Sequence, residues 1–296
     1  MKQFIYNILW FGFCLILINM ILFSITYAVY LRPYENVDLT YRTYLLSDSH
    51  GLALADLMEN DGIFNFSAGS DSYVDMLRKL KYLINHSHVK KIILTVDDHQ
   101  LSPYRNLSNN LDRSLFFASR QDFSNIFEFF KCNLKRYCVL LNPKSRDILD
   151  SWFESLFTDR KNVRKWKDVP ENEKDRRSLA RVNVQFRYKK QADLLLTSLN
   201  QIIALCRMHD IEIVGIKYPL SKNFIRVKGD RRFFADDVLN YYDLKVYDFE
   251  ELFKERDDYF LNTDHLNSEG GRAFAEVLLN HVIRHEEGIY GQALLF

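Results

Sequence analysis

The chain has 296 residues, with 40 Lys and Arg against 39 Asp and Glu, so its net charge is +1. A general nucleic-acid binder would show a basic excess, so we expect no nucleic-acid partner. An apolar content of 47%, with 10 Gly and 5 Pro, excludes disordered, collagen-like and low-complexity classes. Four Cys in a chain of this length do not make a disulfide scaffold. The length suits one sizeable α/β domain with an anchor, or two small domains.

The N-terminal segment has no charged residue between Lys2 and Arg32. The apolar stretch 4–31 is long enough to cross a bilayer, which takes about 20 residues. A cleaved signal peptide is the alternative, but its apolar core would be shorter and would end in a small-x-small site. We therefore expect residues 1–34 to form an uncleaved signal anchor with a single membrane span. The weak charge pattern places the N-terminus inside and the main domain outside the cytoplasm.

From residue 43 onward, short apolar runs alternate with stretches of helical periodicity. This order, with its long crossovers, predicts a mainly parallel sheet with helices on both faces, in a domain spanning 35–296. Residues 100–182 interrupt the order, and we interpret them as an inserted helical cap. Ser268 is the expected N-cap of the final helix. The predicted strands are 44–46, 62–66, 89–96, 211–216 and 245–249, and the predicted helices are 52–58, 73–84, one within 183–209, and 268–283.

A polar segment, Ser-Asp-Ser-His-Gly at 47–51, joins the end of the first strand to the start of a helix. The hydroxyl of Ser49 would be exposed there, and the helix N-terminus would offer N–H donors to an oxyanion. Taken alone, the segment also fits an ordinary helix cap, because Ser and Asp are the usual capping residues.

A second polar segment, Asn-Thr-Asp-His-Leu-Asn at 262–267, precedes the last helix. His265 at this loop–helix junction could act as general base to a serine elsewhere in the chain. A single histidine is more often structural, so the pairing of the two segments is more informative than either one.

Together these segments resemble the first and last motifs of the SGNH (GDSL-type) hydrolase superfamily. The resemblance covers about 43–99 and 183–284, and it is greatest to the membrane-anchored branch that includes the D-alanyl-transfer protein of teichoic acid synthesis and the alginate O-acetyltransferases. It implies a flavodoxin-like three-layer α/β/α fold. It also implies that Ser49 is the nucleophile, that His265 is the base, and that the N–H groups of Ser49 and Gly69 form the oxyanion hole.

The first motif, G-D-S, matches with Ser47 in place of its Gly, and two further motifs depart from the family pattern. The third motif, G-x-N-D, reads Asp-Asp-His-Gln at 97–100, which puts His99 at the position of an oxyanion donor. The last motif, D-x-x-H, begins with Asn262, which would orient His265 without the charge of a carboxylate. If the loop follows the family, Asp264 points elsewhere and Asp258 could substitute. The carboxylates in possible support are Asp48, Asp258 and Asp264.

The resemblance implies a membrane-anchored O-acyl transferase or esterase, with O-acetyl as the expected acyl group. Its substrate would be an envelope or exported polysaccharide, and its partner a membrane-bound O-acyltransferase. No cofactor and no metal are expected. The alternative is a protein that keeps the fold with a degenerate site and binds a glycan or scaffolds an exopolysaccharide assembly.

Two further features remain open. Cys132 and Cys138 are close enough in sequence to form a small disulfide loop, or they are two free thiols. The segment 160–190 holds twelve basic and four acidic residues, a net charge of +8. It could contact an anionic lipid or an acidic polysaccharide, or it could simply be a solvated insert.

Overall fold

The computed structural model describes residues 1–142, 144–157 and 164–284. The chain divides into two compact units. The first unit comprises Met1–Asn36 and Leu111–Val163, and the second comprises Val37–Asn110 and Arg164–Phe296. The N-terminal helix therefore forms a unit with part of the segment that we expected to be a cap, while the described residues 164–182 belong with the sheet.

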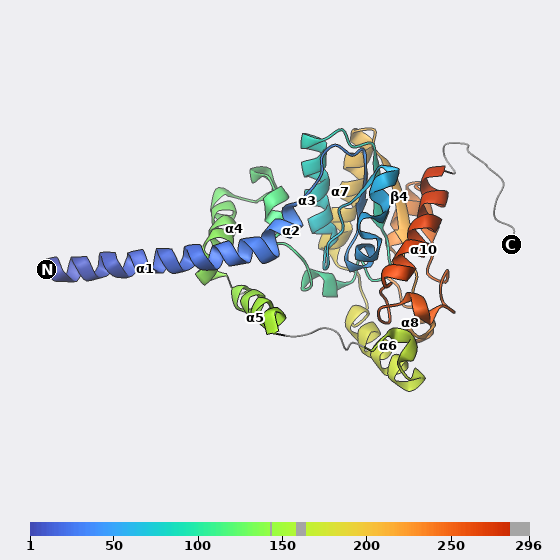
Figure 1. The fold of residues 1–296 in the computed structure, drawn as a ribbon. Coiled ribbons are helices and arrows are strands. Elements are labelled where there is room, and N and C mark those ends of the chain that lie inside the picture. Colours follow the sequence, from blue (N-terminus) through green and yellow to red (C-terminus); the bar gives the residue numbers. More distant parts are fainter. Residues whose placement is uncertain (143, 158–163, 285–296) are drawn as a thin grey trace. The chain divides into compact units, whose positions relative to one another are not determined.

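The second unit contains a five-stranded sheet in the order β2-β1-β3-β4-β5 (Figure 1). All four neighbouring pairs are parallel, with Leu45 opposite Ile93 and Ile93 opposite Val214 in the central register. This confirms the predicted fold class, because each predicted strand overlaps an observed one. The strands are β1 Thr43–Leu46, β2 Ile63–Asn65, β3 Lys91–Thr95, β4 Glu212–Lys217 and β5 Val246–Asp248.

Helices lie on both sides of this sheet, with α3 and α7 together on one side and α10 on the other (Figure 1). The core on the α10 side joins Phe274 and Leu278 to the strand residues Leu45, Ile93 and Val214. The helices of this unit are η2 Ser49–Asp61 (a 3₁₀ helix), α3 Tyr73–His86, η3 Pro103–Asn106 (3₁₀), η8 Trp166–Asp168 (3₁₀), α6 Glu171–Gln185, α7 Asp193–Met208, α8 Lys222–Lys228, α9 Ala235–Tyr241, η9 Asp257–Tyr259 (3₁₀), α10 Ser268–Leu279 and η10 Asn280–Arg284 (a π-helix).

The cap of α10 differs from the prediction by one residue. Asn267, not Ser268, is the N-cap, and its side-chain oxygen accepts hydrogen bonds from the backbone N–H groups of Glu269 and Gly270. Asn and Ser are almost equally good caps, so the sequence did not separate the two neighbours.

The order of the strands decides where polar loops meet. The connections after β1 and β3 leave the sheet in opposite directions along the strand order, so a crevice forms between the carboxyl ends of these two strands. The segment 47–51 follows β1 and the segment 97–100 follows β3. The segments assigned to the first and third motifs of the resemblance therefore meet at the same place.

The first unit contains a helical stretch, Lys2–Glu35, with a mean hydropathy of 2.5 in its most apolar window. Within the part of the chain that the structure describes, it is the one helix long and apolar enough to cross a membrane. An ion pair between Glu35 of this stretch and Arg136 connects the stretch to helix α4. The elements are α1 Lys2–Thr26, η1 Tyr27–Leu31 (a π-helix), α2 Arg32–Glu35, η4 Ser114–Phe117 and η5 Arg120–Asp122 (both 3₁₀), α4 Ile126–Tyr137, η6 Val139–Leu141 (3₁₀) and α5 Ser145–Phe157.

In the second unit, α10 packs directly on η2 because Gly271 has no side chain. A Cβ atom at position 271 would lie 2.0 Å from the backbone oxygen of Ala53 in η2. No rotamer can relieve a clash between a Cβ and a backbone atom, so a side chain here must push the two helices apart.

We predict that Gly271→Ala lowers the free energy of unfolding by about 1–3 kcal/mol, through this overpacking. The sign is diagnostic, because Gly→Ala inside a helix otherwise stabilises by about 1 kcal/mol. Urea unfolding of the solubilised full chain measures the change, with Arg272→Ala at the exposed neighbouring position as the matched control. A Gly271→Ala chain as stable as the native one would mean that α10 and η2 do not approach this closely.

Candidate active site

Ser49 follows the end of β1 by three residues and is the first residue of η2. The carboxylate of Asp48 caps this helix by accepting a hydrogen bond of 3.0 Å from the backbone N–H of His50. The turn also packs tightly against the loop after β2, since a Cβ at Gly51 would lie 2.2 Å from the hydroxyl oxygen of Ser67. The cap and this close contact hold the half-buried Ser49 at the N-terminus of a helix, where backbone dipoles favour negative charge.

The hydroxyl of Ser49 meets the imidazole of His265, with 2.8 Å between Oγ and Nε2. On the other side of the ring, Nδ1 lies 3.0 Å from an oxygen of Asp264 and 3.0 Å from the side-chain oxygen of Asn262. Both of these oxygens are acceptors, so Nδ1 carries the proton. Nε2 is then left as the acceptor for the Ser49 hydroxyl, which is the tautomer that a general base requires.

The loop that carries His265 is held in shape by hydrogen bonds between side chains and its backbone. The side-chain oxygen of Asn262 accepts hydrogen bonds of 3.1 Å from the backbone N–H groups of both Asp264 and His265. The hydroxyl of Ser221 donates to the carbonyl of Thr263 at 2.7 Å, and the hydroxyls of Thr263 and Ser178 share a short hydrogen bond. Asn262 therefore shapes the loop as well as contacting the imidazole.

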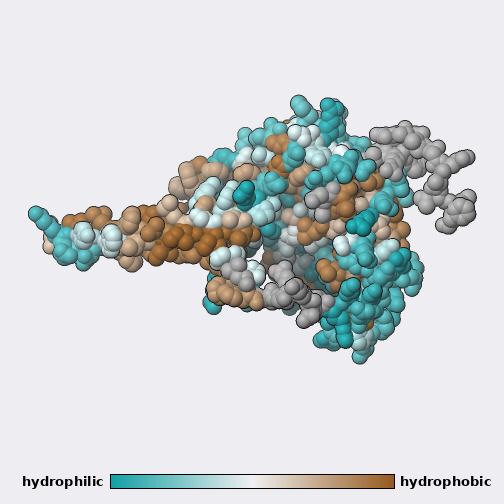
Figure 2. All heavy atoms as spheres, in the orientation of Figure 1, coloured by the Kyte–Doolittle hydropathy of each residue, from teal (hydrophilic) through white to brown (hydrophobic). Residues whose placement is uncertain are grey.

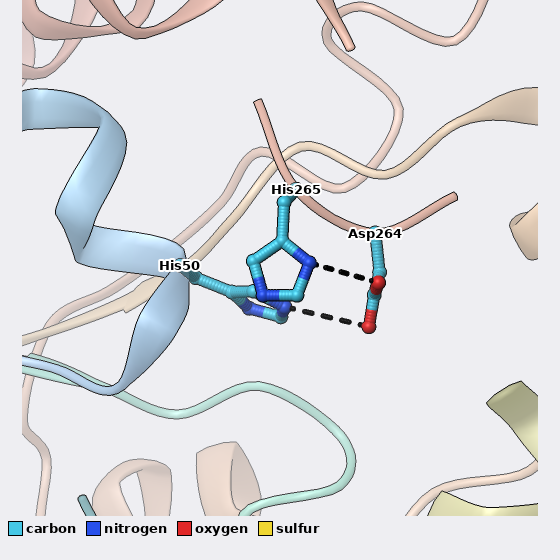
Figure 3. A group of neighbouring side chains, drawn as sticks. All are labelled: His50, Asp264 and His265. Atoms are coloured by element: carbon cyan, nitrogen blue, oxygen red, sulfur yellow. Dashed lines mark hydrogen bonds and ion pairs between the residues drawn. The ribbon is translucent and has the colours of Figure 1, made fainter. Parts of the chain in front are cut away.

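The Asp264 carboxylate is almost fully buried, and it lies beside two imidazoles (Figure 3). One oxygen contacts His265, and the other accepts hydrogen bonds from Arg181 at 2.7 Å and from Gln185 at 3.0 Å and lies 3.8 Å from Nε2 of His50. Burial alone would raise the pKa of Asp264, but His265, His50 and Arg181 hold it well below its usual range. Asp264 is therefore ionised at neutral pH.

This geometry changes two expectations for the loop. The expectation that Asp264 points away from the base is wrong, because the turn closed by Asn262 directs its carboxylate back to His265. Asp258 does not substitute for it, because its carboxylate is partly exposed and pairs with Arg256 at 2.8 Å. The carboxylate beside the imidazole thus comes from the residue immediately before His265.

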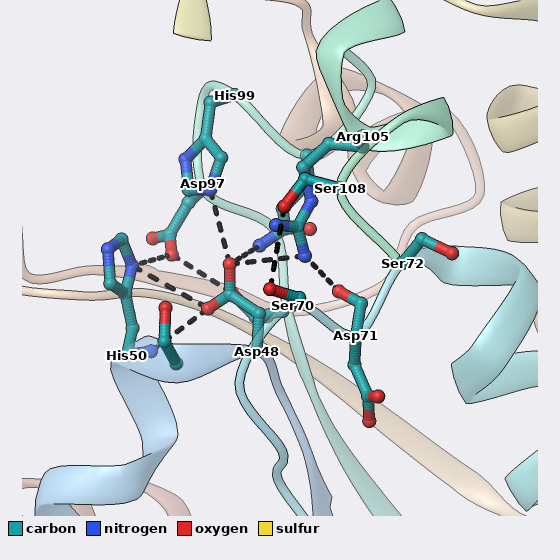
Figure 4. Close-up of polar contacts among 12 residues, drawn as sticks. Asp48, His50, Ser70, Asp71, Ser72, Asp97, His99, Arg105 and Ser108 are labelled. Carbon is teal, nitrogen blue, oxygen red and sulfur yellow. Dashed lines mark hydrogen bonds and ion pairs between the residues drawn. The ribbon is translucent and has the colours of Figure 1, made fainter. Parts of the chain in front are cut away.

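The ring of His50 lies at the centre of a buried polar network (Figures 3 and 4). Its Nδ1 is 2.6 Å from a carboxylate oxygen of Asp97 and 3.9 Å from Asp48. Its ring contacts that of His265 edge to face, with 4.9 Å between centroids. Burial opposes protonation, but the charges of Asp48 and Asp97 raise the pKa of His50 well above its ordinary value. His50 is therefore a buried imidazolium among three carboxylates.

Asp48 joins the loops after β1 and β3 in this network (Figure 4). Its second oxygen accepts hydrogen bonds from Gln100 at 3.0 Å and from His99 at 3.2 Å, and it lies 3.4 Å from the guanidinium of Arg105. Arg105 in turn donates to the backbone carbonyl of Asp71, in the loop after β2. Asp48 therefore supports the backbone around Ser49, and among the residues that the structure describes it makes its polar contacts with His50, His99, Gln100 and Arg105.

His99 has a different partner from the one that the sequence predicts. Burial lowers the pKa of His99, which keeps the ring neutral with one N–H. That N–H is on Nε2, because its partner there is the acceptor Asp48. Nδ1 is then an acceptor, and a neutral His99 in this tautomer has no N–H left to donate to an oxyanion. The roles of the Ser49 and Gly69 N–H groups in an oxyanion hole remain predictions.

Two sets of ligand-type atoms lie close enough to hold a metal ion, namely His50 with Asp264 and His265, and His50 with Asp48 and Asp97. A metal ligand must be a neutral imidazole, so a metal ion would have to displace the proton that the charges of Asp48 and Asp97 favour on His50. A metal in the first set would also compete with the contacts that His265 makes with Ser49 and Asp264. The donor chemistry of these residues therefore fits a hydrogen-bonded network better than a metal site.

Sequence reasoning missed four members of this network: His50, Arg105, Arg181 and Gln185. Arg181 and Gln185 are four residues apart on α6, so they share a face, but they looked like part of a solvated basic segment. Their partner Asp264 is about 80 residues away, and no local pattern links the two sites. His50 was visible in the segment 47–51, and its position directly after Ser49 was the available signal.

No family model and no curated protein matches this chain. Among similar solved structures is a GDSL-like lipase from Bacteroides thetaiotaomicron, with a TM-score of 0.45 and 7% identity over 88% of this chain and 98% of that one. Another is a candidate acylhydrolase from Bacteroides fragilis, with a TM-score of 0.44 and 7% identity over 86% and 95% of the two chains. A third is a Bacillus subtilis protein, with a TM-score of 0.41 and 9% identity over 86% and 58%.

We predict that the charge on His50 makes stability pH-dependent above neutrality. Because folding raises the pKa of His50, the protonated ring stabilises the folded protein. This contribution is complete below the unfolded-state pKa of about 6.5, and it is lost as the pH rises towards the pKa of the folded state. The stability difference between the native chain and His50→Gln should therefore shrink by about 1.4 kcal/mol per pH unit above about pH 6.5.

Urea unfolding of the solubilised chains between pH 6 and pH 9 checks this, with His88→Gln at an exposed position as the matched control. A His50→Gln difference that does not vary with pH would show that His50 is neutral in the folded protein.

Proposed function

We propose that this protein is a serine-dependent acyl-ester enzyme, an esterase or O-acyl transferase of the SGNH type. The observation that carries the proposal is the contact of 2.8 Å between the Ser49 hydroxyl and Nε2 of His265, with Nδ1 against the buried, ionised Asp264. A serine, an imidazole and a carboxylate in this order form the arrangement that makes a hydroxyl nucleophilic at neutral pH.

The reaction proceeds in two balanced steps. Oγ of Ser49 attacks the acyl carbonyl while His265 takes the hydroxyl proton, and the ester oxygen of the donor leaves with that proton. In the second step, water or a sugar hydroxyl attacks the acyl-serine and gives its proton to His265. The bond between the acyl carbon and Oγ of Ser49 then breaks, and Oγ takes that proton from His265, which restores both residues. The imidazolium that forms in each step is stabilised by Asp264. Water gives hydrolysis and a sugar hydroxyl gives transfer.

We further propose that α1 anchors the enzyme in a membrane and that the acyl group is exchanged with an envelope or exported glycan, beside a membrane-bound acyltransferase. The length and hydropathy of Lys2–Glu35 support the anchor. In the second unit, a hollow of about 600 Å³ is bordered by Tyr104, Asn183, Arg187 and Tyr188. The charge of Arg181, which binds Asp264, acts on Tyr104 at the border of this hollow. Aromatic faces with a few polar groups are suited to holding a sugar ring near the site.

We predict that Ser49→Ala abolishes turnover of p-nitrophenyl acetate by the full chain in detergent, because the attacking oxygen is absent. His265→Gln should lower kcat by a factor of about 10³ or more, because it removes the base. The release of p-nitrophenol measures both. Urea unfolding shows whether each variant is folded, so that loss of activity is attributed to chemistry.

Equal turnover by the native and Ser49→Ala chains would remove Ser49 from the mechanism. If the native chain turns over neither this ester nor an acetylated oligosaccharide, and Ser49 resists labelling by a fluorophosphonate, the site is inactive and the protein binds or scaffolds a glycan instead.

The two loop carboxylates should behave differently. We predict that Asp264→Asn lowers kcat by a factor of about 10³–10⁴ with little change in KM, because an amide cannot stabilise the imidazolium. Asp258→Asn is the matched control, since that carboxylate pairs with Arg256, and it should keep native kinetics. If Asp264→Asn retains full activity, Asn262 alone suffices to orient the base.

A further inference from the structure

The outer face of α4 in the first unit carries a continuous apolar stripe. Phe127, Phe130, Leu134 and Tyr137 are spaced by three, four and three residues, which places them on one face of a helix. Their exposed fractions are 81%, 61%, 57% and 56%. The next turn, η6, continues the stripe with exposed Leu140 and Leu141. Exposed apolar side chains in such a row are typical of an interaction surface.

The opposite face of α4 already has its partners within the unit. Arg136 is buried and pairs with Glu35. Cys132 borders a cavity of about 180 Å³ together with Thr26, Tyr30 and Leu31 of the N-terminal helical stretch. Cys132 and Cys138 are both free thiols, so no disulfide constrains the helix. The inner face of the helix therefore packs through Arg136, Cys132 and Phe129, whose ring meets that of buried Phe123, while the stripe remains exposed.

Hydrogen bonds from Asn19 fix which part of α1 lies beside the C-terminal end of the stripe. Its side-chain amide donates to the carbonyl of Tyr137 at 3.0 Å and accepts from the N–H of Leu140 at 3.4 Å. The rings of Phe23 and Tyr137 also meet, at 5.7 Å between centroids. Asn19 lies about 26 Å along the helix from Lys2, whereas a bilayer's hydrocarbon layer is about 30 Å thick.

Backbone groups at membrane depth must be satisfied by protein, because lipid offers no hydrogen bonds. The chain between α4 and η6 leaves helical geometry at Cys138. Asn19 supplies a partner to each side of that break, at Tyr137 and at Leu140. The side-chain amide of Asn19 and the backbone groups beside the helix break therefore satisfy one another's hydrogen bonds. Figure 2 shows the apolar surface of α1.

We propose that α4 and η6 are inserted into the lipid leaflet that the second half of α1 crosses, with the stripe Phe127–Leu141 in the acyl-chain layer. The occupant of the stripe is the bilayer itself. Lys131 is exposed beside the stripe, where its charge can reach anionic headgroups. This inference rests on the proposed membrane anchor and adds a second membrane contact to it.

Three single-cysteine chains test the proposal, each made in a full-length background with Cys14, Cys132, Cys138 and Cys206 replaced by Ser. The new cysteines are Phe130→Cys on the stripe, Lys135→Cys on the polar side of the same helix as the matched control, and Ile16→Cys in α1 as a control for the anchor. Each carries an NBD fluorophore in vesicles of phosphatidylcholine and phosphatidylglycerol. Brominated lipids then report contact with acyl chains, and iodide reports contact with water.

We expect brominated lipid to quench the label at position 130 at least about twofold more strongly than the label at position 135. Iodide should quench the label at position 135 more strongly than the label at position 130. Quenching of position 130 by iodide, with position 16 in lipid, overturns the inference and leaves the anchor standing. Position 16 in water refutes the anchor. A label at position 130 shielded from both quenchers means that protein covers the stripe, which also overturns the inference.

A second measurement uses the unaltered chain, so it does not depend on the substitutions. A diazirine probe dissolved in the lipid phase should label the peptide that spans the stripe, as well as α1. Labelling of α1 without that peptide would contradict the insertion.

Discussion

The carboxylate of Asp264 lies between two imidazoles and a guanidinium, and the rest of the candidate site depends on keeping this buried group ionised. A lone carboxylate at this depth would take up a proton, since burial disfavours its charge. Three cationic or proton-bearing neighbours come from three elements, with His50 on η2, Arg181 on α6 and His265 on the loop before α10. Satisfying one charge therefore fixes the relative positions of the elements that carry the serine and the base.

A second layer of charges keeps these partners in place. His50 is itself protonated, because Asp48 and Asp97 face it, and Asp48 is in turn held by Gln100, His99 and Arg105. Ions buried in this way are strongly coupled, since removal of one partner leaves its neighbour buried without compensation. Such a network contributes positional precision at the reacting atoms more than it contributes net stability.

Much of the fold could be read from the sequence, because the strands are apolar runs and two of the long helices have clear periodicity. The Ser49–His265 pair was also accessible, since each residue lies at a junction between a predicted strand or loop and a helix. The network around them was not accessible. Arg181 and Gln185 bury polar groups against a partner that is distant in sequence, so composition alone suggested a solvated segment. The orientation of Asp264 was missed because it depends on the turn that Asn262 closes, and a turn of this kind reverses the direction of a side chain without changing its residue type.

The close contact between α10 and η2 has a consequence for biogenesis. Ser49 and His265 are 216 residues apart, and Gly271 lets the last helix reach Ala53 beside the serine. Synthesis begins at the N-terminus, so the helical stretch that we propose as the anchor leaves the ribosome long before α10 does. Until α10 docks, Ser49 has no base and remains an ordinary hydroxyl. In the function that we propose, Ser49 therefore becomes reactive only when the final helix has folded.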